Sequence, residues 1–106
     1  MYDIFIYDVY TKSHTLISHN NSGVIGNQPS QSPTISADGR YVAYVSSADN
    51  LVDNDTNNSA DIFLYDRQSE TTKRISVDSN GNEGIGTLCD LPSISADGKY
   101  ITYQSN

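Results

Sequence analysis

The chain has 106 residues, of which 13 are acidic and 6 are basic, so its formal net charge at pH 7 is −7. This balance argues against binding to nucleic acid or to an anionic membrane surface, because both are bound through clustered lysine and arginine. The length is that of a single domain spanning 1–106, and no stretch approaches the roughly 18 apolar residues of a membrane helix.

Tyrosine is the dominant aromatic residue, with eight copies against two phenylalanines and no tryptophan, which suits half-buried β-sheet surfaces. Cys89 is the single cysteine. It cannot form an intrachain disulfide, and we expect a buried or partly buried thiol. The residues after Met1 lack the basic start and apolar run of a signal peptide, so the chain is expected either to be cytoplasmic as it stands or to lack an upstream part.

The elements predicted in the first half are short strands. The apolar run from Ile4 to Tyr7 predicts a strand covered on both faces. A weaker strand from His14 to Ser18 and a long polar loop from Asn20 to Gln31 follow. From Arg40 to Ser46 the residues alternate with a period of two, which predicts a strand with two usable faces.

The same order returns in the second half, with strands at Ile62 to Tyr65, Thr72 to Val77 and Lys99 to Ser105 and a polar loop at Ser79 to Asp90. No segment shows helical periodicity over more than a few residues. An all-β, antiparallel fold is therefore predicted.

Two segments return later in the chain in closely similar form. Residues 3–8 (Asp-Ile-Phe-Ile-Tyr-Asp) return at 61–66 (Asp-Ile-Phe-Leu-Tyr-Asp) with an offset of 58, and residues 32–41 return at 91–100 with an offset of 59. Self-similarity at a fixed spacing predicts equivalent structural units. Within the second segment, Asp38-Gly39 and Asp97-Gly98 predict tight hairpin turns, which account for both aspartates without a catalytic role.

The repeat also predicts where the units are cut. With four strands to a unit, the chain holds half a unit, one whole unit from Thr34 to Val77, and a second half unit. A strand near each end of the chain is then left with one edge unpaired, and such edges aggregate or pair with a partner.

The pattern Pro-x-Ile-Ser-x-Asp-Gly-Arg/Lys-Tyr-x-x-Tyr, at 33–44 and again at 92–103, resembles the repeat of TolB-like β-propellers, a group related to WD-repeat propellers. The segment 50–57 followed by 61–66 is similar to bacterial members of that group. The resemblance implies antiparallel propeller blades in the order half blade, full blade, half blade. Members of the group are often periplasmic or extracellular, and their fold alone does not supply a function.

Two blades cannot close a ring, because propellers need about four to eight. We therefore expect a homo-oligomer in which the hairpins at the two ends of neighbouring copies complete shared blades, with a trimer favoured. The alternatives are a fragment of a longer propeller protein and a different compact or swapped oligomer.

A metal site is the strongest chemical prediction. Oxygen-bearing side chains recur at every second position from 53 to 61, and Ca²⁺ binds six to eight such oxygens. The predicted ligands are Asp53, Asp55, Asn57, Ser59 and Asp61. The loop lacks the central glycine and distant glutamate of an EF-hand, and a turn-forming polar loop is the competing interpretation.

Other chemistry is sparse. His14 and His19 have no Cys or His cluster beside them and are expected at the surface. No Gly-x-Ser-x-Gly motif occurs, so no catalytic residue is assigned. The repeated tyrosines at 41, 44, 100 and 103 are expected to pack between blades, with a surface for protein or carbohydrate ligands as the alternative.

These observations predict a non-catalytic binding or scaffold module, stabilised by Ca²⁺ and without nucleic acid or membrane partners. The alternative from another class is a propeller lyase or hydrolase with its site at the central channel.

Overall fold

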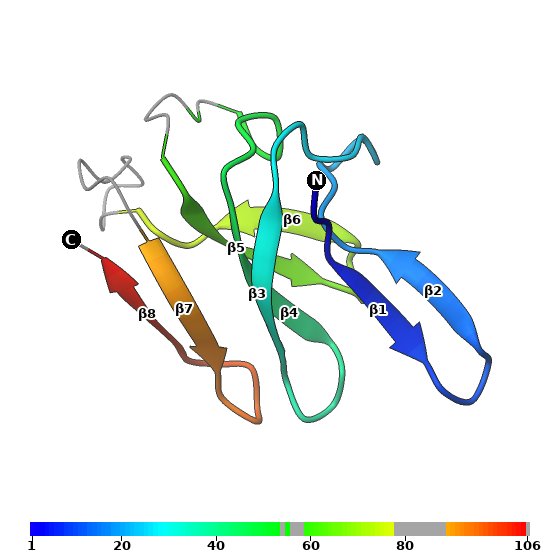
Figure 1. Cartoon of the computed structure of the whole chain (residues 1–106). Helices are drawn as coiled ribbons and strands as arrows, with labels where there is room; N and C mark the ends of the chain where they lie inside the picture. Colours follow the sequence, from blue (N-terminus) through cyan, green and yellow to red (C-terminus); the bar gives the residue numbers. More distant parts are fainter. Residues whose placement is uncertain (54, 56–58, 78–88, 106) are drawn as a thin grey trace.

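The structure, a computed structural model, describes residues 1–53, 55, 59–77 and 89–105. Within these ranges the chain forms eight β-strands, and every strand pairing is antiparallel. The strands form three sheets of two, four and two strands (Figure 1). The prediction of an all-β, antiparallel fold is confirmed, and the grouping follows the strand order expected from the doubled segments.

The central sheet has the order β3–β4–β5–β6, with β3 at Ser30–Ile35, β4 at Tyr41–Ser46, β5 at Asp61–Asp66 and β6 at Thr71–Arg74. Its two inner strands are rich in aromatic and β-branched residues, which pack well on a pleated surface. One face contributes Tyr44 and Phe63 to the main hydrophobic core. The other contributes Val45 and Ile62 to a second cluster. Both faces of this sheet are therefore buried at its centre.

Two hairpins flank the central sheet on opposite sides, as Figure 1 shows. Strand β1 (Phe5–Asp8) pairs with β2 (Ser13–Leu16), and β7 (Cys89–Ile94) pairs with β8 (Ile101–Ser105). Strand β7 packs against β3, β4 and β5. Cys89, at its start, is a buried free thiol, as predicted.

The Asp-Gly segments form tight turns between paired strands, as predicted. Gly39 and Gly98 have φ angles of 73° and 76°, a region that glycine adopts without a steric penalty. Asp38 Oδ1 accepts hydrogen bonds from the Ser36 hydroxyl and from the backbone N–H of Arg40, at 2.7 and 3.0 Å. Asp97 makes the equivalent pair of bonds. Both aspartates therefore stabilise turns, which explains them structurally.

Strand β3 begins inside the polar loop predicted from the sequence. It contains Pro33, and its pairing with β4 shifts register between Gln31 and Thr34. Ser32 has a φ angle of 55°, and its counterpart Leu91 in β7 has a φ angle of 52°. A β-bulge lets a strand contain a proline, because the extra residue leaves the ladder where the proline has no N–H to donate.

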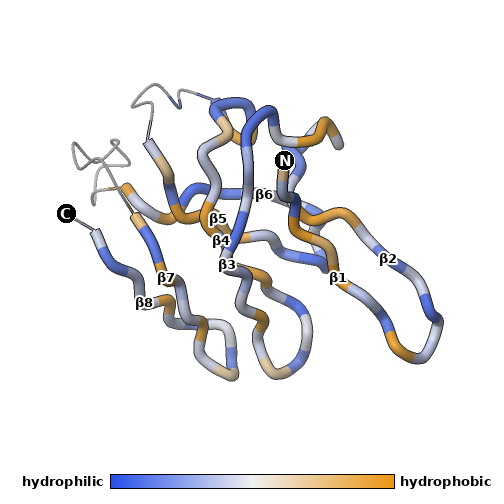
Figure 2. Tube along the Cα trace, in the orientation of Figure 1, coloured by the Kyte–Doolittle hydropathy of each residue, from blue (hydrophilic) through white to orange (hydrophobic). Residues whose placement is uncertain are grey.

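One burial prediction was wrong. The run from Ile4 to Tyr7 was expected to be covered on both faces, but Phe5 is 60% exposed and Tyr7 is 48% exposed. In the described structure strand β1 pairs only with β2, and this hairpin lies at one end of the molecule (Figure 1). Figure 2 shows the hydrophobic stretch on this outlying strand.

The outer edge of β6 is covered by the loop that follows β2. The Asn21 side-chain oxygen accepts a hydrogen bond of 2.6 Å from the backbone N–H of Thr72. The Thr72 hydroxyl donates to the backbone oxygen of His19, at 2.7 Å. No helix in the described ranges is long and apolar enough to cross a membrane.

Candidate functional site

The doubled segments make the same local hydrogen bonds. The Ser76 hydroxyl accepts from the backbone N–H of Ile62 and donates to Asp61, at 3.1 and 2.8 Å. The Ser18 hydroxyl accepts from Ile4 and donates to Asp3, at 3.1 and 3.0 Å. In both copies a serine hydroxyl thus links an aspartate side chain to the backbone at the start of the apolar segment. This arrangement gives Asp61 a structural role that does not require a metal.

The predicted metal ligands are placed in different environments. Asp53 is exposed, Ser59 is half-buried, and Asn57 lies outside the described residues. The side chains of Asp55 and Asp61 are only 2% and 3% exposed. Within the described part of the chain, no group of three or more His, Cys, Asp or Glu side chains is placed to hold a metal ion. The calcium site therefore stays a prediction.

Arg74 is the residue that brings two of these acids together. Its Nη1 lies 3.3 Å from Asp55 Oδ1 and 3.7 Å from Asp61 Oδ2, and its side chain is 7% exposed. Three charged groups thus share a buried environment, in which the positive charge of the guanidinium stabilises the negative charges of the two carboxylates. The position equivalent to Arg74 in the first half of the chain is Leu16, so this cluster belongs to the central sheet.

Sequence reasoning missed Arg74, although a signal was present. Thr72, Arg74 and Ser76 alternate along the chain, and the two that flank Arg74 are buried. An arginine on the inward side of such an alternating segment, in a chain with only six basic residues, indicates an acidic partner nearby.

The repeated tyrosines separate into two groups. Tyr44 is fully buried and stacks on Phe63, with ring centroids 5.9 Å apart, and its burial raises the pKa of its hydroxyl well above the usual value. Tyr41 lies under the Arg40 guanidinium, 4.8 Å from its ring centroid. Their counterparts Tyr103 and Tyr100 are 38% and 71% exposed.

The two histidines are apart from each other. His14 is exposed and its ring lies 4.6 Å from that of Tyr7. His19 is half-buried rather than fully at the surface, with its ring 5.0 Å from that of Tyr65. Its Nδ1 lies 2.7 Å from the backbone oxygen of Asn20.

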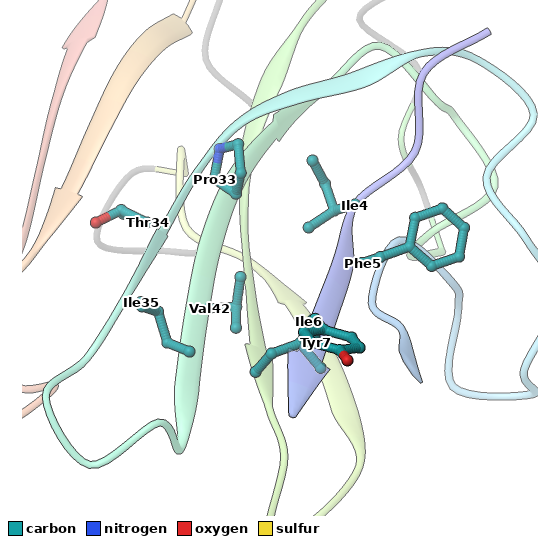
Figure 3. A pocket seen from close by; sticks show the side chains of 8 residues that line it. All are labelled: Ile4, Phe5, Ile6, Tyr7, Pro33, Thr34, Ile35 and Val42. Atoms are coloured by element: carbon teal, nitrogen blue, oxygen red, sulfur yellow. The ribbon is translucent and has the colours of Figure 1, made fainter. Parts of the chain in front are cut away.

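An apolar cleft of about 530 Å³ separates β1 from β3 and β4. Figure 3 shows Ile4 on the side of β1 that faces Pro33 and Val42, whereas the Phe5 ring points away. Of the side chains lining the cleft, those of Tyr7 and Thr34 carry a polar group. Such a lining suits the packing of apolar groups better than acid–base chemistry. The lining residues are Ile4, Phe5, Ile6, Tyr7, Pro33, Thr34, Ile35 and Val42.

The first hairpin and the cleft beside it differ from the equivalent parts of the chain in the exposure of their apolar residues. Pro33 is exposed at the cleft, whereas its counterpart Pro92 is buried. Phe5 is 60% exposed, whereas its counterpart Phe63 is 0% exposed. Apolar residues exposed together on one sheet mark a surface for association. We take this surface, with the edges of β1 and β8, as the candidate functional site.

The sequence and the structure were compared with those of known proteins. No family model and no curated protein matches the sequence. The structure is similar to that of TolB from Acinetobacter baumannii, with a TM-score of 0.46 and 17% sequence identity. The match covers 97% of this chain and 34% of TolB, so the chain spans about a third of TolB's length.

Proposed function

We propose that this chain is a non-catalytic binding and scaffold module of the β-propeller type, completed by pairing with further copies of itself. One observation carries the proposal: equivalent apolar residues are buried in the central sheet and exposed in the hairpins. Phe63 and Tyr44 are 0% exposed, while Phe5 and Tyr103 are 60% and 38% exposed. A second copy that supplies the missing neighbours would bury them.

The strand numbers support completion by another copy. The hairpins β1–β2 and β7–β8 each form a two-stranded sheet, whereas the central sheet has four strands. An isolated two-stranded hairpin is only marginally stable in water. One hairpin of each kind gives a four-stranded sheet like the central one. Three copies would make six such sheets, a number within the range of about four to eight that closes a propeller.

Native mass spectrometry and light scattering test this assembly. The expected result is a mass of three chains of 11.6 kDa each at micromolar concentration. Phe5→Asp should shift the population toward monomer, because it places a charge on the surface to be buried. Val24→Asp, at a loop residue that is 52% exposed, is the matched control and should leave the mass unchanged. A monomer of the unmodified chain at these concentrations would overturn the proposal.

Stabilisation by Ca²⁺ is part of the proposed function. Asp55 and Ser59 line a polar pocket of about 280 Å³ together with Gln28, Ser47 and Asp49. All of these side chains carry oxygen, the ligand atom that Ca²⁺ prefers. Calorimetry and thermal melting with Ca²⁺, before and after EDTA treatment, test the site. Asp49→Asn, at a residue that lines this pocket, should weaken binding. The absence of both heat and a melting shift would rule out the metal site.

A module of this type is expected to bind a protein or a carbohydrate at aromatic residues that stay exposed in the assembly. Substrate screens with glycosides, lactones and esters, with and without EDTA, test the non-catalytic role. Metal-dependent turnover in any of them would contradict it.

A further inference from the structure

Two strands in the described structure have one neighbour each and an apolar surface left open. Strand β1 pairs only with β2, and β8 pairs only with β7. Their counterparts by sequence offset are β5 and β4, which pair with each other over their full length. The central sheet therefore contains an intact copy of the contact that β1 and β8 lack.

The register of that contact can be transferred residue by residue. In the central sheet Tyr44 lies opposite Phe63, and Ala43 lies opposite Leu64. Applying the offsets of 59 and 58 places Tyr103 opposite Phe5 and Thr102 opposite Ile6. We infer that β8 of one copy pairs antiparallel with β1 of a second copy in this register. This inference rests on the proposed function and specifies the surface through which the copies associate.

The aromatic residues fit this pairing. Tyr44 and Phe63 stack with an interplanar angle of 24°, and both are 0% exposed. Tyr103 and Phe5 have the same side chains at the equivalent positions, yet remain solvent-exposed within one chain. Pairing between copies would bring the two rings together and remove both from water.

Charge fits the pairing as well. Arg40 and Asp66 join the ends of β4 and β5 through two hydrogen bonds of 3.0 Å each. The equivalent residues are Lys99 and Asp8. Asp8 already has the turn geometry of Asp66, because its Oδ1 accepts backbone N–H groups at 2.9 and 3.1 Å. A lysine at 99 supplies the positive charge, although without the two-pronged geometry of arginine.

The contact between the central sheet and the β7–β8 hairpin also has an unoccupied equivalent at the first hairpin. A Cβ at Gly98 would clash with the Tyr41 ring, so the turn between β7 and β8 lies directly against β4. Gly39 is the counterpart of Gly98, but no aromatic ring of the described residues lies against it. Tyr100, the counterpart of Tyr41, is 71% exposed. A second copy whose β8 adjoins β1 would bring its own Tyr100 to the Gly39 turn.

The apolar cleft is explained by the same arrangement. In the complete junction, β7 packs against β3, β4 and β5, and Pro92 is buried there. The cleft lies where β3 faces β1, and Pro33 is exposed in it. Strands β7 and β8 of a second copy, added beside β1, would extend the sheet that faces β3 and cover this cleft. Each copy would receive one neighbour at β1 and offer β8 to another, a head-to-tail contact.

Disulfide trapping tests the register. In a Cys89→Ser background, Thr102→Cys combined with Ile6→Cys should form covalent oligomers on mild oxidation. Residues opposite each other in antiparallel strands have Cα atoms about 4.5 to 5.5 Å apart, within the range a disulfide spans. The matched control combines Thr102→Cys with Tyr7→Cys, one residue out of register and on the other face. We expect at least about tenfold less cross-linking there.

The outcomes separate this inference from the proposed function. If the chain forms a trimer but the control pair cross-links as well as the in-register pair, the register is wrong and the assembly stands. If no oligomer forms before oxidation, both proposals fail. A cross-linked trimer from the in-register pair alone supports both.

Charge variants give a second readout that does not require new cysteines. Lys99→Glu places two negative charges at the contact and should weaken association by about tenfold or more. Lys73→Glu makes the same charge change at an exposed position on β6 and should leave association unchanged. Lys99→Arg should strengthen association, because arginine can bind Asp8 as Arg40 binds Asp66. Equal effects of Lys99→Glu and Lys73→Glu would overturn the pairing.

Discussion

Phe63 and Phe5 provide a comparison of one side chain in two environments within one molecule. Phe63 is 0% exposed and stacks on Tyr44, whereas Phe5, at the equivalent position, is 60% exposed. Truncation of Phe63 to alanine would cost about 3–5 kcal/mol, a large share of the roughly 5–15 kcal/mol that stabilises a typical domain. Leucine is therefore the better substitution, because it keeps most of the apolar volume.

The expected loss for Phe63→Leu is the sum of two effects. A change of shape in a packed core costs up to about 1.5 kcal/mol, and loss of the aromatic pair costs about 0.5–1.5 kcal/mol. We expect the free energy of unfolding to fall by about 2 kcal/mol, equivalent to a decrease in melting temperature of about 8–16 °C for a domain of this size. Phe5→Leu in a monomeric chain should cost less than about 0.5 kcal/mol, as at other surface sites.

Urea unfolding followed by circular dichroism, at a low and a high protein concentration, measures both effects. The decrease in unfolding free energy for Phe63→Leu should be present at both concentrations. The decrease in unfolding free energy for Phe5→Leu should grow with concentration, because the proposed assembly would bury Phe5. Equal losses for the two variants at low concentration, or a Phe5→Leu loss that does not change with concentration, would refute this reasoning.

Three further predictions concern single positions. Arg74→Met should lower the free energy of unfolding by about 3–5 kcal/mol in urea titrations at neutral pH, because two buried carboxylates lose their guanidinium. Hydrogen bonds from Arg40 hold the pKa of Asp66 at about 2, below its usual 3.8. The contribution of this pair is therefore complete above the usual pKa and is lost as the pH falls toward 2. Arg40→Met should accordingly lower the urea midpoint at neutral pH, and the difference from the unmodified chain should shrink through that acidic range. Gly98→Ala should lower the melting temperature measurably, because the added Cβ would clash with the Tyr41 ring at a positive φ angle; an unchanged melting curve would contradict this close approach.

The strands and turns were predictable because their signals are local. Alternation from Arg40 to Ser46 and the Asp-Gly turns depend on neighbours a few residues away, and the structure has them where expected. The start of β3 was not predictable in this way. Pro33 normally argues against a strand, and only the bulge before Thr34 makes it compatible with the ladder.

The candidate site was less predictable, because burial depends on which elements come together. The apolar run at Phe5 and the one at Phe63 are nearly identical in sequence, yet only Phe63 has strands on both sides of it. Counting oxygen atoms along the acidic loop predicted a metal. The strand pairing that brings Arg74 to Asp55 and Asp61 could not be seen from that loop alone.

The hydrogen bond from Thr72 to Asn21 has a consequence for how large an assembly can grow. The outermost strand of the central sheet uses its Thr72 N–H on a side-chain oxygen, so that group is not available to template a foreign strand. Sheet edges that lack such protection are the sites at which proteins stack into fibrils. In the proposed assembly, this protection would favour contacts through β1 and β8 over the addition of further strands to β6.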